Sequence, residues 1–143
     1  MDERTWSPFE LTDHTADLLL NARGRDLAEL LANAARGLLA AIGQLRTSPE
    51  LAEVSVALTA ADREELFHDF LSEVLFLFEN QHFVVESLRF DLLDDCRLDA
   101  ILSGGMLDRQ ASVFHREVKA VTYHELAIRR AGGFLEATVV LDI

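Results

Sequence analysis

Cysteine is scarce in this chain: Cys96 is the single cysteine among 143 residues. One cysteine excludes an internal disulfide and a zinc site built from several cysteines. Because Cys96 follows Asp94 and Asp95, whose carboxylates disfavour the thiolate, it is also a poor nucleophile. We therefore expect a buried or inert cysteine.

Basic side chains are also few. The sequence has 13 Lys and Arg against 25 Asp and Glu, which gives a formal net charge of −12. A chain this acidic repels the phosphates of nucleic acids, so we expect no direct nucleic-acid binding. The charge is better matched to a basic protein partner or to a cation.

Long apolar runs are absent as well. No uncharged apolar segment is long enough to span a bilayer, so no membrane-spanning helix is expected. The first twelve residues lack the basic start and the following apolar run of a signal peptide. We accordingly expect a cytoplasmic protein.

The usual local signatures of an enzyme are missing. The sequence has no phosphate-binding loop and no dinucleotide-binding glycine pattern, and it has no serine nucleophile elbow. The five histidines are not spaced as zinc ligands. The glycine pairs Gly104-Gly105 and Gly132-Gly133 are better explained as turns than as phosphate cradles.

Two long helices are predicted by a repeated start signal, D-x-x-E, in which the aspartate accepts hydrogen bonds from free N–H groups. The first signal is Asp26 and Glu29, and apolar residues follow at helical spacing until Gly43. The second is Asp62 and Glu65. That second helix is expected at the centre of the core, through Leu66, Phe67, Phe70, Val74, Leu75 and Phe78.

Alternating apolar residues predict strands over residues 16–22, 54–58, 83–92 and 97–102, with a loop over 104–116. Residues 117–130 and 134–143 resemble a hairpin around Gly132-Gly133. A two-residue loop there pairs Ala131 with Phe134, and it sets Glu136 opposite Arg129 and Asp142 opposite Tyr123. We therefore predict a single α+β domain over 1–143, with two long helices packed on mixed or antiparallel sheet.

The segment DHTAD, residues 13–17, places two carboxylates and an imidazole beside the first predicted strand. Alternation sets Asp17 on the face opposite Leu18 and Leu20, and it sets Asp142 opposite Leu141. Both aspartates thus point away from the core. Together with the main-chain carboxylate of Ile143 they form a set of hard oxygen ligands, which suits calcium, magnesium or manganese.

Each of these residues also has a simpler interpretation, because charged side chains are mostly solvated. His14 either ligates a metal or hydrogen-bonds the neighbouring turn, and sequence alone favours the turn. His124 falls on the apolar face of the predicted hairpin, which favours a core histidine. Lys119 is most simply a solvated lysine, and Asp13 could merely end a preceding strand.

Four segments, taken together, resemble the archease family. They are residues 13–17 with the LLLNARGRDLAELLANAARGL that follows, DREELFHDFLSEVLFLFE at 62–79, VKAVTYHELAI at 118–128, and ATVVLDI at 137–143. They keep the order of the family from about residue 9 to residue 143, whereas residues 81–117 match poorly. The resemblance implies a small cytosolic accessory protein and not a stand-alone enzyme.

The resemblance also implies a metal site and a partner. Archeases assist the GTP-dependent RNA ligase of tRNA splicing by promoting its guanylylation and turnover, and they bind a divalent metal, often calcium. Carried onto this sequence, the ligands are Asp17, Asp142 and Ile143. Four further residues of the family motifs are candidates for supporting the site or contacting the partner: Asp13, His14, Lys119 and His124.

Two other functions stay open from the sequence. One is a chaperone-like modulator of a tRNA methyltransferase, which the resemblance permits and the acidic charge does not exclude. The other is a metal-dependent hydrolase that uses the same aspartates. A hydrolase needs a general base and a substrate pocket, and the sequence identifies neither.

Overall fold

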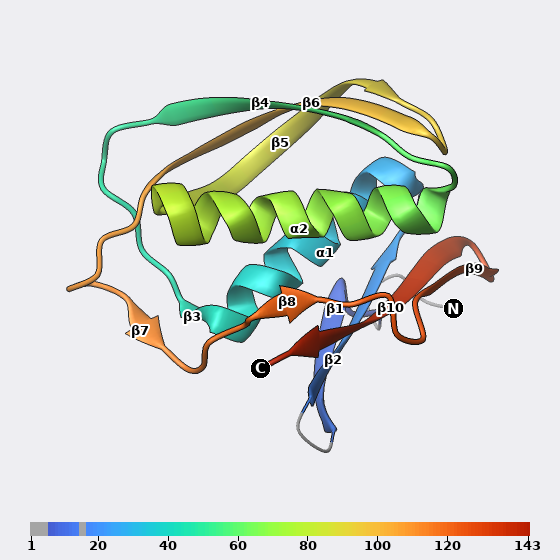
Figure 1. Cartoon of the computed structure of the whole chain (residues 1–143), viewed down its shortest axis with the longest axis horizontal. Coiled ribbons are helices and arrows are strands. Elements are labelled where there is room, and N and C mark those ends of the chain that lie inside the picture. The colour runs from blue at the N-terminus through green and yellow to red at the C-terminus, as the bar shows by residue number, and fades with distance from the viewer. Residues whose placement is uncertain (1–5, 15–16) are drawn as a thin grey trace.

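Two helices lie between two antiparallel sheets in the computed structural model, which describes residues 6–14 and 17–143 (Figure 1). The elements in chain order are β1 (Phe9–His14), β2 (Asp17–Gly24), α1 (Leu27–Ile42), β3 (Gly43–Gln44), β4 (Ala52–Thr59), α2 (Arg63–Gln81), β5 (Phe83–Leu93), β6 (Arg97–Met106), β7 (Val113–Phe114), β8 (Ala120–Val121), β9 (Ala127–Ala131) and β10 (Phe134–Asp142). This arrangement confirms the α+β prediction.

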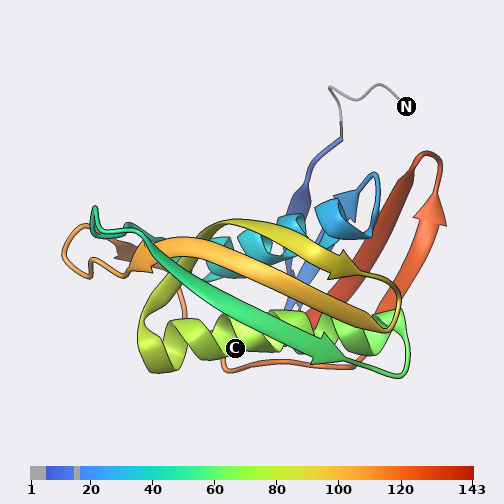
Figure 2. The same cartoon turned by 90° about the horizontal axis from the view of Figure 1, so that it is seen from above.

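The larger sheet has the order β1-β2-β10-β8, and β9 pairs with another part of β10. The second sheet has the order β4-β6-β5, and it covers the two helices when the molecule is seen from above (Figure 2). A short pairing joins β3 to β7. Every strand pairing among the described residues is antiparallel, which selects one of the two sheet types expected from the sequence.

Both helices begin where the D-x-x-E signals predict. The side chain of Asp26 accepts a hydrogen bond from the N–H of Glu29, and that of Asp62 accepts one from the N–H of Glu65, each at 2.8 Å. α1 ends at Gly43, whereas α2 ends at His82, which has a left-handed backbone with φ of 56°. The aspartate caps fix where each apolar stripe enters the core.

The core lies between the helices and both sheets. Phe67 and Phe70 of α2 are fully buried, as predicted for the centre of the core. On the larger sheet Leu18 and Leu20 are buried from β2, which confirms the predicted alternation of that strand. α1 packs against β2 on one side and β5 on the other, so it joins the two sheets.

Two sequence predictions in the middle of the chain are wrong, and one alternative of a third is excluded. Gly104 and Gly105 do not form a turn but continue β6, where a Cβ on Gly104 would collide with the carbonyl oxygen of Val84. The predicted loop 104–116 also contains β7, which pairs with β3. Cys96 is exposed in the turn between β5 and β6, so it is not a buried cysteine.

The C-terminal hairpin confirms the predicted register only near its turn. Phe134 pairs with Ala131 and Glu136 with Arg129, as expected. The single strand predicted over 117–130 is wrong, because the chain turns between Tyr123 and Leu126 and divides it into β8 and β9. Asp142 consequently pairs with Ala120 and not with Tyr123.

We expect Phe70→Ala to lower the free energy of unfolding by about 3–5 kcal/mol, because it removes a fully buried ring and leaves a cavity. Phe76→Ala on the same helix is the matched control, since Phe76 is 51% exposed and should change stability by about 0.5 kcal/mol or less. Urea unfolding of both variants measures the difference. Equal losses would contradict the assignment of Phe70 to the core centre.

Candidate functional site

The two aspartates singled out by the sequence lie opposite each other in neighbouring strands. Asp17 of β2 and Asp142 of β10 are register partners, and the adjacent pair Leu18 and Leu141 is almost fully buried. Side chains directly opposite each other in an antiparallel pair share a face, with Cβ atoms roughly 5 Å apart. The structure therefore confirms that the two aspartates converge on the face away from the core.

The pair lies in a row that crosses four strands. On one side the backbone of His14 in β1 pairs with Asp17, and on the other Ala120 in β8 pairs with Asp142. The N–H of Lys119 donates to the carbonyl oxygen of Asp142 at 2.7 Å. We call the end of the sheet formed by Asp17, Asp142 and Ile143 the acidic corner.

The other predicted site residues do not all share the face of this corner. Asp13 pairs with Leu18, so the register sets it on the other face of the sheet. The side chain of His14 falls outside the part of the chain that the structure describes. His124 is exposed in the turn between β8 and β9, where its side chain is 73% accessible, so the prediction of a core histidine is wrong.

The acidic corner offers oxygen donors. Asp17 is half-buried, Asp142 is exposed, and Ile143 is half-buried beside them. Within residues 6–14 and 17–143, no three side chains of His, Cys, Asp or Glu gather closely enough to hold a metal. The corner therefore supplies two carboxylates, and a bound cation would take its other ligands from main-chain oxygens and water, as hard cations commonly do.

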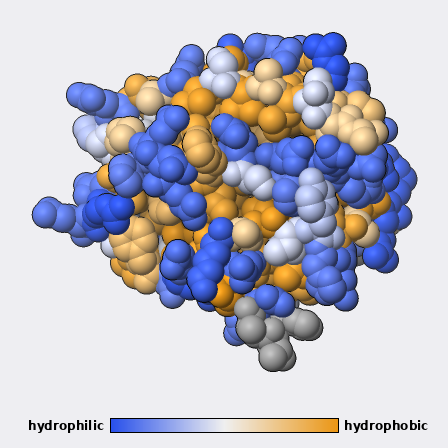
Figure 3. Space-filling model, viewed as in Figure 1, coloured by the Kyte–Doolittle hydropathy of each residue, from blue (hydrophilic) through white to orange (hydrophobic). Residues whose placement is uncertain are grey.

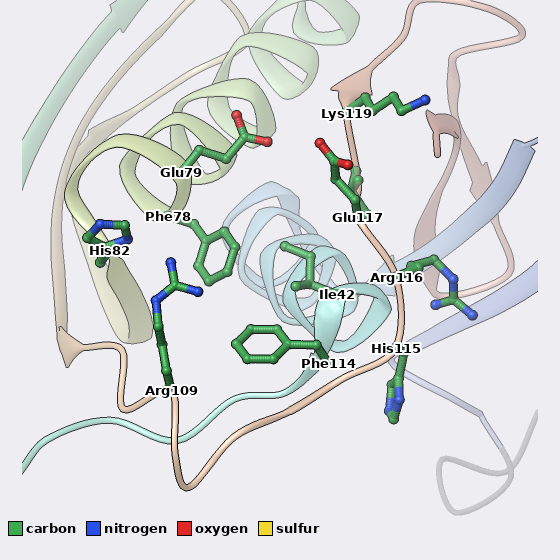
Figure 4. A pocket seen from close by; sticks show the side chains of 11 residues that line it. Ile42, Phe78, Glu79, His82, Arg109, Phe114, His115, Arg116, Glu117 and Lys119 are labelled. Carbon is green, nitrogen blue, oxygen red and sulfur yellow. The ribbon is translucent and has the colours of Figure 1, made fainter.

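An open groove adjoins this corner. Its volume is about 690 Å³, and its lining residues come from the ends of α1 and α2 and from the chain before β8: Ile42, Phe78, Glu79, His82, Arg109, Phe114, His115, Arg116, Glu117, Val118 and Lys119. Glu79 and Glu117 point toward each other across it, whereas His115 points away (Figure 4). Lys119 links the groove to the corner, because it lines the groove and its main-chain N–H bonds the carbonyl oxygen of Asp142.

A second polar cluster joins α2 to the chain around β8. The ring of His68 stacks on that of Tyr123, with ring centres 3.7 Å apart. Its Nδ1 lies 2.9 Å from Asp69 Oδ1, and its Nε2 lies 2.9 Å from the carbonyl oxygen of Val121. The Tyr123 hydroxyl donates to the same Asp69 oxygen at 3.2 Å.

The charge of this cluster affects Tyr123. Partial burial, followed by the negative charge of Asp69 and its hydrogen bond, raises the pKa of Tyr123, with smaller contributions from Glu65 and Asp62. Sequence reasoning missed the cluster, because its two halves belong to separate elements and no local pattern joins them. The groove was missed for the same reason, since the segment before β8 was expected to be a loop or strand.

Comparison with known proteins fits this geometry. The model of the Archease protein family (MTH1598/TM1083) matches residues 9–143. The chain belongs to the archease family. The protein archease of Methanosarcina mazei is 34% identical over 140 residues, which cover 94% of this chain and 95% of that relative. Family membership supports an accessory role for the chain.

Two solved structures share the fold of this archease-family chain. The solution structure of Methanobacterium thermoautotrophicum protein 1598 matches with a TM-score of 0.76 at 29% identity, over 95% of this chain and 99% of that one. A Thermotoga maritima crystal structure, titled an archease and possible chaperone, matches with a TM-score of 0.63 at 23% identity, over 92% and 94%. The second likeness shows the fold alone. Among the described residues, no helix is long and apolar enough to cross a membrane.

We expect Asp69→Asn to lower the pKa of Tyr123 toward its ordinary value of 10.0, because it removes the nearest negative charge. The measurement is the ultraviolet absorbance of the phenolate during alkaline titration, which Tyr123 alone produces as the single tyrosine. Asp95→Asn, which changes an exposed carboxylate in the turn between β5 and β6, serves as the control. An unchanged pKa in Asp69→Asn would contradict the contribution of Asp69 to the shift.

Proposed function

We propose that this protein activates a GTP-dependent RNA ligase of tRNA splicing and holds a divalent metal at the acidic corner. The observation that carries the proposal is the register pairing of Asp17 with Asp142 on the outer face of the larger sheet. Their carboxylates and a main-chain oxygen of Ile143 are the ligands in this proposal. The partner itself comes from the family resemblance.

Calcium fits this donor set first. It takes six to eight oxygen ligands in flexible geometry, so two carboxylates and main-chain oxygens can be completed by water or by a partner. Magnesium and manganese also prefer oxygen ligands and are the alternatives. A metal bound here would neutralise phosphate charge during nucleotidyl transfer.

The surface around the corner supports a protein partner. The chain carries a net charge of −12, which suits the basic RNA-binding face expected of a ligase. The groove beside the corner is lined by Lys119, so a partner seated over the corner would also meet the groove. Asp13, His14, Lys119 and His124 are the residues that we propose for contact or support.

A chaperone-like modulator of a tRNA methyltransferase is the second candidate. It is favoured by exposed apolar side chains, among them Val113 at 53% and Phe114 at 44%. On the face seen in Figure 3, hydrophobic surface shows between the hydrophilic residues. Exposed apolar surface of this kind can bind a partner protein whose own apolar side chains are exposed. This candidate predicts that suppression of partner aggregation survives the loss of Asp17.

We expect Asp17→Ala and Asp142→Ala each to weaken calcium binding, measured by titration calorimetry on the isolated protein. The loss should exceed the roughly 10- to 100-fold that removal of a residue supporting a ligand costs, because here a ligand itself is removed. Asp95→Ala is the matched control, as an exposed aspartate in the turn between β5 and β6. Unchanged calcium affinity in both corner variants would contradict the assigned ligands.

In ligation assays with the cognate RNA ligase, we expect wild-type protein and Asp95→Ala to support multiple turnovers. Asp17→Ala and Asp142→Ala should give none beyond the ligase alone, while circular dichroism shows that their fold is kept. Normal stimulation by both corner variants would disprove the metal-site mechanism. No stimulation by the wild type would favour the methyltransferase partner.

A further inference from the structure

We propose that His68, in its protonated form, is a positioning residue that ties β8 to α2 and thereby holds the strand beside Asp142. The tie is a property of the protein alone. Its effect on metal binding rests on the function proposed for the acidic corner. Protonation of this partly buried histidine on α2 would then determine how stably β8 pairs with β10 beside Asp142.

The two ring nitrogens of His68 both face hydrogen-bond acceptors. Nδ1 lies 2.9 Å from the carboxylate of Asp69, and Nε2 lies 2.9 Å from the carbonyl oxygen of Val121. A neutral imidazole carries one N–H and donates once, whereas the imidazolium donates from both nitrogens. Only the protonated ring therefore makes both bonds. In the neutral ring, the nitrogen without a proton would point its lone pair at an acceptor oxygen, either that of Asp69 or that of Val121.

Val121 belongs to a strand with few other attachments. β8 has two residues, and its neighbours bond to β10 through Lys119 N–H on Asp142 at 2.7 Å and Thr122 N–H on Val140 at 3.1 Å. On the other side β8 contacts α2, where His68 bonds the Val121 carbonyl. Loss of that bond would leave β8 held by β10, by apolar packing of Val121 and by the hydrogen bond of the nearby Tyr123 hydroxyl to Asp69.

The charged groups around the ring are mainly acidic. Asp69 on α2 lies against Nδ1, while Tyr123, from the turn after β8, stacks on the ring and donates to Asp69. Glu65 in the first turn of α2 and Asp62, which caps that helix, add negative charge near Tyr123. Arg63 is a cation of the same helix, and it bonds the carbonyl oxygen of Ile128 and lies 3.9 Å from Glu64.

This arrangement predicts an unusual pH dependence. Histidine changes its charge between about pH 5 and pH 8, so the tie to Val121 should weaken as pH rises through that range. Metal affinity ordinarily rises with pH, because ligands must lose protons. Loosening of β8 acts in the opposite direction, so it would appear as a loss of calcium affinity above neutral pH.

The first test is amide hydrogen exchange of Lys119 and Thr122 by NMR from pH 5.5 to pH 8.5, without metal. In the wild type we expect their protection to fall by roughly 10-fold across this range, which is the effect of one charge-assisted hydrogen bond. His68→Phe keeps a ring for Tyr123 but has no N–H, so protection should be low at every pH. His68→Gln donates from a neutral amide, so protection should not depend on pH.

Two further variants separate the tie from general effects. Asp69→Asn keeps the imidazole and its bond to the Val121 carbonyl, so a fall in protection with rising pH should remain. His115→Gln removes an exposed histidine that points away from the groove, and it should behave as the wild type. Equal protection at all pH values in wild type and His68→Phe would overturn the proposal.

The second test is calcium affinity by calorimetry over the same pH range. A fall of affinity above neutral pH that His68→Phe abolishes and His115→Gln keeps would support the coupling to the corner. A wild-type affinity that rises throughout would overturn that coupling. If the wild type binds no calcium at any pH, the function proposed for the corner fails, whereas the exchange result still decides whether His68 holds β8.

Discussion

The antiparallel pairing of β2 with β10 is the constraint on which the rest of this structure depends. Leu18 and Leu141 are partners in that pairing and are buried, so the core selects the register. A shift of one residue would turn every side chain to the other face of the sheet. The position of Asp17 opposite Asp142 is therefore determined by the neighbouring leucines and needs no attraction between the two carboxylates.

The helices connect this strand pair to the rest of the fold. α1 packs on β2 and also on β5, so the same helix that covers the buried leucines carries the second sheet. α2 crosses α1 and contacts β8, which flanks Asp142 on the side away from Asp17. Both sides of the acidic corner are thus attached to the core, one through β2 and one through α2.

Local signals predicted most of this arrangement. The aspartate caps located the helix starts, the glycine pair at 132–133 located the hairpin turn, and alternation set Asp17 and Asp142 on the outer face. The failures share a physical cause. Glu125 adopts a left-handed backbone without being glycine, and His68 meets Val121 from another element, so only tertiary contacts determine the turn that exposes His124.

Along one edge, β10 pairs with two short strands: β9 along its first half and β8 at its end. Because a turn separates those strands, the pairing of β8 with β10 is independent of the pairing of β9, as in a local unfolding unit. Without β8, the carbonyl oxygens of Val140 and Asp142 would form an open sheet edge. Such an edge can accept an extended segment of another protein as an added strand.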